Sequence, residues 1–281
     1  MAGRALVLGG GGVTGVAWEL GLITGLADAG VELAAADLVV GTSAGSVVGA
    51  LLRSGVPLEQ LYARQLEGPG AEIAASLRPA LLLRYAWIML TSRDKRKAGV
   101  RFGRLALAAD TVSEADRRAA IAARLPSVDW PAERLLITAI DALTGEFRVF
   151  DRDSGVSLLD AISASCAVPG VWPPATVDGR RYIDGGMRSA TNADLAAKCD
   201  RIVVLSPIAD GGGATSLTRQ VTKLREHAEV VVIKRDAAAR AAAGRDPLDP
   251  ARRGPSARSG RAQAASVAAS VAAVWRASSR E

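Results

Sequence analysis

The stretch GTSAGS, residues 41–46, places Ser43 between two glycines, directly after the apolar run ADLVV (36–40). The segment AGSVVGALLRSG (44–55) then carries apolar side chains at helical spacing and ends in glycine. This order predicts a buried strand, a sharp turn and a helix that begins beside the serine. A strand, the pattern G-x-S-x-G and a helix together are typical of a nucleophile elbow, in which Gly41 and Gly45 allow the chain to bend around an exposed hydroxyl. The alternative is a serine that only caps the helix.

A glycine-rich loop, GGGGVTG (9–15), lies between a predicted strand at 5–8 and a predicted helix at 16–30. Glycines have no Cβ, so successive N–H groups can converge on one point at a helix N-terminus, where the helix dipole also favours negative charge. Because this loop follows the first strand and Ser43 follows the second, we expect the two strand ends to be neighbours. A tight turn for close packing is the alternative. The N–H groups predicted to form an oxyanion hole belong to Gly10, Gly11, Gly12 and Gly15.

The same loop matches the dinucleotide fingerprint G-x-G-x-x-G, so nucleotide binding is an alternative. That fingerprint requires an acidic residue at the end of the second strand, and Gly41–Thr42 stands there instead. A phosphate-binding P-loop requires Lys after its second glycine, and here Val16 follows Gly15. Both nucleotide interpretations therefore fail on their second requirement.

Beyond these motifs the chain continues to alternate strand and helix patterns. The alternation predicts an α/β fold with a mostly parallel central sheet flanked by helices, and with the elbow after the second strand. Composition divides the chain into a large domain at 1–244 and a segment at 245–281 with an Arg/Pro/Gly-rich linker and an Ala-rich helix. The predicted later elements are hairpins at 134–150 and 176–184, strands at 201–207 and 229–234, and a helix at about 215–227.

Two residues are candidates for the group that takes the proton of Ser43. His227 is the one histidine of the chain, and it falls in the last turn of a predicted helix, where backbone carbonyls satisfy such a side chain. Asp184 ends a predicted hairpin strand and precedes Gly185 and Gly186, which allow a sharp turn and a close approach to another backbone. A carboxylate is a weak base for an alcohol, but it suffices where an oxyanion hole supplies most of the stabilisation. A turn residue is the alternative role for Asp184.

Composition limits the location and the partners. The 281 residues carry a formal net charge of +6, and aromatic residues make up 4%, too few for a base-stacking platform, so we expect an anionic lipid surface rather than nucleic acid. Cys166 and Cys199 form no disulfide framework and are predicted to be small buried residues of a reducing compartment. The N-terminal apolar run is too short for a signal peptide, which predicts a cytoplasmic protein, peripheral to a membrane if it binds one.

Three ordered motifs resemble the patatin-like phospholipase family: the glycine-rich loop, the G-x-S-x-G serine and the later D-G-G aspartate. The segment SASCAVPGVWPP (163–174) and the hairpin at 134–150 are also similar to the family, and the resemblance covers about residues 4–207. One departure is in the loop, where bacterial-type members usually carry a basic residue, G-G-G-x-R/K-G, and this chain has Thr14. The motif residues are Gly10, Gly11, Gly12 and Gly15, then Gly41, Ser43 and Gly45, then Asp184, Gly185 and Gly186.

The resemblance implies a patatin-like catalytic domain at 1–244 and hydrolysis of lipid acyl esters, as in phospholipase A or lysophospholipase, through an acyl-enzyme. It implies a dyad in which Ser43 attacks and Asp184 accepts the proton, with no metal and no organic cofactor. A soluble carboxylesterase or thioesterase of the same fold is the nearest alternative. A non-catalytic protein that binds a lipid or a nucleotide is the alternative from another class.

The segment PALLLRYAWIMLTSRDKRK (79–97) joins an apolar stretch to a basic run. One interpretation is a cap helix that enters a membrane interface, with Trp87 and Ile88 in the apolar layer and the basic run at the level of anionic headgroups. The other is a helix that covers the core, followed by a solvated loop. The basic residues are Arg93, Lys95, Arg96 and Lys97.

Overall fold

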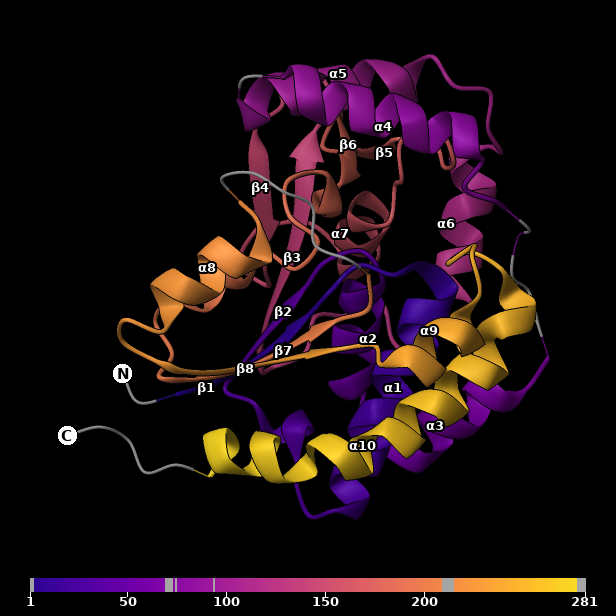
Figure 1. Cartoon of the computed structure of the whole chain (residues 1–281). Helices are drawn as coiled ribbons and strands as arrows, with labels where there is room; N and C mark the ends of the chain where they lie inside the picture. Colours follow the sequence, from indigo (N-terminus) through magenta and orange to yellow (C-terminus); the bar gives the residue numbers. More distant parts are fainter. Residues whose placement is uncertain (1–2, 69–72, 74, 93, 209–214, 277–281) are drawn as a thin grey trace.

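The computed structural model describes residues 3–68, 73, 75–92, 94–208 and 215–276. In these residues the strands form one eight-stranded sheet with the order β5-β6-β3-β2-β1-β7-β8, and β4 also pairs with β3 (Figure 1). The five strands from β3 to β8 along this order are parallel to one another, whereas β4, β5 and β6 pair antiparallel. The strands are β1 (Arg4–Leu8), β2 (Leu38–Gly41), β3 (Arg134–Asp141), β4 (Phe147–Phe150), β5 (Ala175–Val177), β6 (Arg180–Asp184), β7 (Arg201–Ser206) and β8 (Glu229–Lys234).

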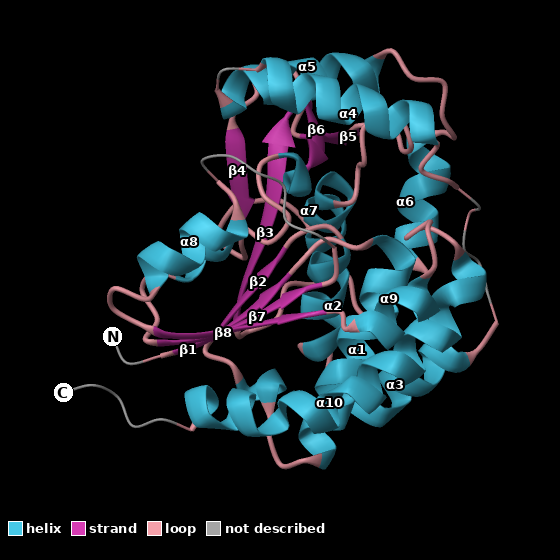
Figure 2. Cartoon of the chain, in the orientation of Figure 1, coloured by secondary structure: helices cyan, strands magenta, loops and turns pink. Residues whose placement is uncertain are grey.

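Helices lie on both faces of this sheet, as Figure 2 shows. The mostly parallel α/β sheet, the elbow after the second strand and both hairpins are therefore confirmed. The helices are α1 (Gly12–Asp28), α2 (Ala44–Leu52), α3 (Leu58–Leu66), α4 (Pro79–Thr91), α5 (Lys95–Leu107), α6 (Glu114–Ala122), α7 (Leu158–Ser165), α8 (Leu217–Leu224), α9 (Ala237–Ala243) and α10 (Arg253–Trp275), with short 3-10 turns η1 (Leu33–Ala35), η2 (Gly185–Met187), η3 (Ala193–Ala196) and η4 (Pro250–Arg252).

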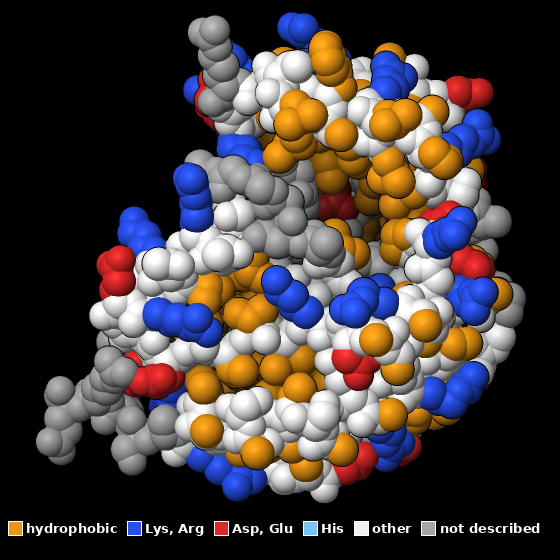
Figure 3. Space-filling view, in the orientation of Figure 1, with side chains coloured by type: hydrophobic (Ala, Val, Ile, Leu, Met, Phe, Trp, Pro, Cys, Tyr) orange, Lys and Arg blue, Asp and Glu red, His pale blue; other side chains and the backbone are white. Residues whose placement is uncertain are grey.

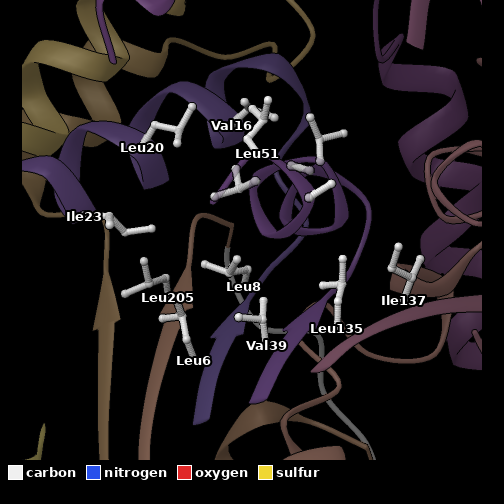
Figure 4. Packing of buried hydrophobic residues seen from close by; sticks show 14 of the residues in the cluster. Leu6, Leu8, Val16, Leu20, Ile23, Val39, Leu51, Leu135, Ile137 and Leu205 are labelled. Carbon is white, nitrogen blue, oxygen red and sulfur yellow. The ribbon is translucent and has the colours of Figure 1, made fainter. Parts of the chain in front are cut away.

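Because side chains alternate along the central strands, apolar groups pack into two cores, one on each face of the sheet. In β1, Leu6 and Leu8 face α1 and α2, whereas Ala5 and Val7 belong to the cluster on the α8 side. Figure 4 shows Leu6 and Leu8 beside Val39 of β2, pointing toward the helices. Because both faces are buried, these strands are continuous apolar runs rather than alternating ones. Cys166 and Cys199 are buried, as the sequence predicts.

The segment 79–97 differs from the single cap helix expected from its sequence. It contains α4 and the start of a second helix, α5, which was not predicted, and residue 93 lies outside the described part of the chain. Asp94 begins α5 because its side chain accepts a hydrogen bond from the N–H of Lys97 at 2.7 Å. Phe102 and Ile88 pack under the two helices against Ile140 and Ile183 of the sheet. The two helices therefore form a cap over the β3–β6 end of the molecule, as seen at the top of Figure 1.

The linker predicted over 245–261 is shorter than expected, because α10 already begins at Arg253. This helix packs along α1, and the contact is close because glycines line it. A Cβ on Gly21 would lie 2.0 Å from the carbonyl oxygen of Ala257, and one on Gly260 would lie 2.3 Å from that of Trp18. The division of the chain at residue 244 remains a prediction, while α10 shares its apolar core with α1.

Candidate active site

Ser43 occupies a strained turn between β2 and α2. Its backbone angles are φ 52° and ψ −115°, an unusual conformation for a residue other than glycine. The neighbouring glycines make the turn sterically accessible, since a Cβ on Gly41 would lie 2.6 Å from the Cα of Ser46. The N–H of Ser43 donates to the hydroxyl of Ser165 at 2.9 Å, and the hydroxyl of Ser46 donates to the carbonyl of Ser43 at 2.6 Å. The turn is thus the nucleophile elbow that the sequence predicts.

Asp184 reaches Ser43 because of the sheet register. Gly41 of β2 pairs with Ile137 of β3, and Ala139, two residues further along β3, pairs with Asp184 of β6. Ser43 is likewise two residues beyond Gly41, so Ser43 and Asp184 lie at the same level on opposite sides of β3. The Ser43 hydroxyl therefore lies near the Asp184 carboxylate, whose pKa it lowers, and that carboxylate accepts the N–H of Gly186 at 2.7 Å.

The carboxylate of Asp184 is more basic than an ordinary aspartate carboxylate. Burial raises its pKa to about 6, and the Ser43 hydroxyl, the hydrogen bond from Gly186 and the nearby charge of Arg117 offset this only in part. The residue is 2% exposed, and Ser43 is 8% exposed. A carboxylate with this pKa is a better proton acceptor than an ordinary one and still remains ionised near neutral pH.

A buried amide, which the sequence reasoning missed, joins the serine and aspartate segments. Asn192 adopts a left-handed backbone conformation, with φ 50°, and is fully buried. Its Nδ2 lies 3.0 Å from Oγ1 of Thr42, 3.3 Å from Oγ1 of Thr138 and 3.4 Å from the carbonyl oxygen of Gly185. A polar residue in the loop after D-G-G gave only a weak sequence signal, because its partners are distant in the chain.

The glycine loop lies against the serine, but its glycines differ in what they can donate. A Cβ on Gly10 would lie 3.5 Å from the Cβ of Ser43. The N–H of Gly10 donates to the carbonyl of Ala190 at 2.8 Å, and the N–H of Gly15 donates to that of Gly11 at 2.8 Å. Within the described ranges, no protein acceptor takes the N–H groups of Gly11 and Gly12, which stand at the N-terminus of α1. Of the four glycines expected to donate, only Gly11 and Gly12 therefore keep an N–H that no acceptor in the described ranges occupies.

His227 lies at the other edge of the sheet. Ser43 follows the C-terminal end of β2, whereas His227 precedes the N-terminal end of β8, and the strands between them are parallel. Its Nε2 lies 2.9 Å from the carbonyl oxygen of Ala197. The structure thus brings Ser43 together with Asp184 and leaves His227 apart.

Ser43 opens onto an apolar cavity. The space beside it is lined also by Trp172 and Arg117, whose guanidinium lies 3.8 Å from the centroid of the Trp172 ring. A larger cavity of about 320 Å³ continues from it, because the two share Val13, Val16, Val47 and Arg124 as wall residues. The floor of the larger cavity is mostly apolar and its rim mostly polar. The further lining residues are the buried Leu51, Leu61, Gln65 and Ala120 on the floor, and the exposed or half-buried Ala123, Arg64, Glu67, Gly68 and Arg253 at the rim.

Comparison with known proteins finds, among others, two short sequence matches and two structural neighbours. Lysophospholipase nte1 of Aspergillus fumigatus and that of Neosartorya fischeri are each 35% identical over 102 residues, which are 36% of this chain and 6% of those proteins. The crystal structure of VipD from Legionella pneumophila has 13% identity and a TM-score of 0.48, covering 96% of this chain and 67% of that one. The type III effector ExoU has 14% identity and a TM-score of 0.41, covering 96% and 53%. The chain thus spans only a small part of the curated relatives that it matches.

A family model of patatin-like phospholipases matches residues 6–197. This range includes the glycine loop, the serine elbow and the Asp184–Gly185–Gly186 segment, and it is more than half of the 281 residues. The chain therefore belongs to the patatin-like phospholipase family.

Proposed function

We propose that the protein is a serine-dependent hydrolase of lipid acyl esters, of the phospholipase A or lysophospholipase type. The observation that carries this proposal is the sheet register that places Ser43, on a strained elbow, level with the buried carboxylate of Asp184. The family and the fungal lysophospholipase matches support a lipid substrate. Hydrolysis of a soluble ester or thioester is the second candidate, because the serine and aspartate would act on either.

In this mechanism the Ser43 oxygen attacks the ester carbonyl while Asp184 accepts the hydroxyl proton. The oxyanion that forms accepts hydrogen bonds from the N–H groups of Gly11 and Gly12, helped by the dipole of α1. Collapse of this intermediate breaks the ester bond, and Asp184 returns the proton to the leaving alcohol. Water then attacks the acyl-enzyme by the same route and releases the fatty acid. Gly10 and Gly15 act through loop shape, since their own N–H groups are already used.

The cavity beyond Ser43 suits the acyl chain. Its floor comes from apolar side chains of α1, α2 and α6, so a hydrocarbon chain entering from the serine would replace water along Val47 and Leu51. The arginines at the rim, Arg64 and Arg253, lie where the chain would meet solvent. This arrangement favours a long acyl group over a short one.

The α4 surface suits contact with a membrane. Leu83, Trp87 and Leu90 are 73%, 64% and 84% exposed, although they are large and apolar. Figure 3 shows hydrophobic side chains at this end of the molecule around a hollow beneath α4 and α5. None of the described helices has both the length and the apolar character that crossing a bilayer requires. We infer a cytoplasmic protein whose α4 rests on the membrane interface.

The cations near this surface differ from those expected. Arg96 pairs with Glu146 at 2.9 Å, and Lys97 lies 3.7 Å from Asp94, so both have acidic neighbours within the chain. In contrast, Arg84 and Arg104 line an open groove with the exposed Trp87. We therefore assign contact with anionic headgroups to the groove rather than to the basic run. Ile88 also lines this groove, but it is 7% exposed and packs inward, so it offers little apolar surface to a membrane.

Replacing Asp184 with Asn should slow labelling of Ser43 by a fluorophosphonate at least about 100-fold, because an amide cannot accept the hydroxyl proton. Intact-protein and peptide mass spectrometry would measure the rate and the site. Asp184→Asn is compared with Ser43→Ala, which removes the site, and with His227→Ala, which should label like the wild type. Labelling that requires His227 would establish a triad instead, and no labelling of the wild type would favour the non-catalytic alternative.

The rate should also follow the ionisation of Asp184. Because the ionised carboxylate is the base, kcat/KM on a soluble ester should rise with pH through about 6 and stay level above it. Initial rates between about pH 4 and pH 9 would show the step, with thermal unfolding at each pH to separate acid denaturation. A midpoint near that of an ordinary carboxyl group, about 4, would contradict a buried base.

Filling the larger cavity should alter chain-length preference. Ala123→Trp places a ring into that cavity from its rim without touching Ser43, so turnover of a palmitate ester should fall about tenfold relative to a butyrate ester. The matched control is Ala115→Trp, an exposed position on the same helix that does not line the cavity. Equal loss with both esters, or no loss with either, would show that the chain binds elsewhere.

Removing the exposed apolar groups of α4 should weaken membrane binding while sparing soluble substrates. The triple variant Leu83→Ser, Trp87→Ser, Leu90→Ser should lose about tenfold or more in cosedimentation with phosphatidylglycerol vesicles. Val128→Ser, another exposed apolar residue but outside α4, is the control. If the triple variant binds vesicles like the wild type, then α4 is not the contact surface; if it also loses soluble-ester turnover, its packing has been damaged.

A further inference from the structure

Arg235 is a buried cation at the catalytic edge of the sheet that the proposed mechanism does not use. It directly follows β8, whose C-terminal end lies at the same edge as that of β2 because the intervening strands are parallel. The residue is 7% exposed, and its Nη2 donates to the hydroxyl of Thr14 at 3.1 Å. Its guanidinium carbon also lies 5.8 Å from the ring centroid of Trp18. A buried arginine is thus directed at the glycine loop.

The hydrogen bonds continue from Thr14 to the peptide between Gly11 and Gly12, and Gly12 lines the same cavity as Ser43. The Thr14 hydroxyl is 3.4 Å from the carbonyl oxygen of Gly11, to which it donates, and the N–H of Gly15 donates to the same oxygen at 2.8 Å. The carbonyl of Gly11 and the N–H of Gly12 belong to one peptide plane and point in opposite directions, because the bond is planar and trans. Holding the carbonyl therefore also fixes the direction of the Gly12 N–H. A cation at the far end polarises the same chain of bonds and makes that N–H a stronger donor.

The charge of Arg235 is retained in this buried setting. Burial lowers its pKa to about 10, so the guanidinium remains protonated near neutral pH, and the neighbouring Glu19 favours that state. Glu19 accepts the N–H of Gly9 at 2.9 Å, and burial raises the pKa of Glu19 well above its ordinary value. Arg235 therefore lies behind the loop as a protonated guanidinium.

We propose that Arg235 is a positioning residue for the oxyanion hole, acting through Thr14 and the Gly11–Gly12 peptide. From the position directly after β8 it supplies a positive charge to a loop, residues 9–15, that has no charged side chain of its own. The inference rests on the proposed acyl-hydrolase function. It assigns the cation behind the glycine loop to a residue more than 200 positions further along the chain. Its effect is on the oxyanion, so it acts on the chemical step and not on substrate binding.

The test measures kcat and KM on a soluble ester for Arg235→Met, Arg235→Lys, Thr14→Val and the Arg235→Met, Thr14→Val double variant. Arg235→Met should lower kcat about tenfold with little change in KM, a smaller loss than that for direct removal of an oxyanion donor. Arg235→Lys should recover much of the loss, because the charge remains. Thr14→Val removes the hydroxyl that links Arg235 to the Gly11 carbonyl. The double variant should therefore be no slower than the slower single variant.

The control is Arg53→Met, which removes another partly buried arginine that donates to the carbonyls of Ala34 and Ala36, before β2 and thus at the opposite edge. It should lower the thermal midpoint without changing kcat. Independent, multiplying losses in the double variant, or an Arg235→Met enzyme with wild-type kcat, would overturn the role of Arg235 while leaving the hydrolase intact. A wild type that turns over no ester would overturn both proposals.

Discussion

The site depends on one close backbone contact, between the start of α2 and the end of β1. A Cβ on residue 45 would lie 2.1 Å from the carbonyl oxygen of Leu8, so only glycine allows this approach. With Gly45 there, its N–H donates to the carbonyl of Gly9 at 3.0 Å, which joins the elbow to the glycine loop. A larger residue would separate the serine from the amides of Gly11 and Gly12. The contact thus sets the distance between the serine and these amides, which are the nucleophile and the oxyanion donors of the proposed mechanism.

A serine can work without histidine in such a setting because two features share the task. Burial raises the pKa of Asp184 to about 6, which brings the base closer to the pH at which it works. The oxyanion donors lie in the same low-dielectric region, where fixed dipoles stabilise developing charge more strongly than water-exposed ones. Burial therefore strengthens both the base, at the end of β6, and the anion site, which follows β1, and β3 and β2 hold these two strands at a fixed separation.

Much of the fold was predictable, because the strong signals are local. Apolar runs indicated the central strands, and the turn at Asp178–Gly179, where both residues have positive φ, indicated the hairpin that ends in Asp184. The weak signals were those of elements that depend on distant partners. The helix α5 is mostly polar along its outer side and packs on β3 and β6 through a few residues, including Phe102. The early start of α10 depends likewise on the glycines of α1, which admit it closely.

The sequence alone determined which serine, aspartate and loop are the candidates for the site, because each sits in a short motif whose glycines have a local steric purpose. Tertiary structure decided what these residues can do together. In the folded chain His227 lies at the edge of the sheet opposite to Ser43, and the N–H of Gly10 donates to the carbonyl of Ala190. Asn192 and Arg235, which are distant in sequence, lie at the site. Hydrogen-bond partners and burial are properties of residues that meet across the sheet, and no local pattern encodes them.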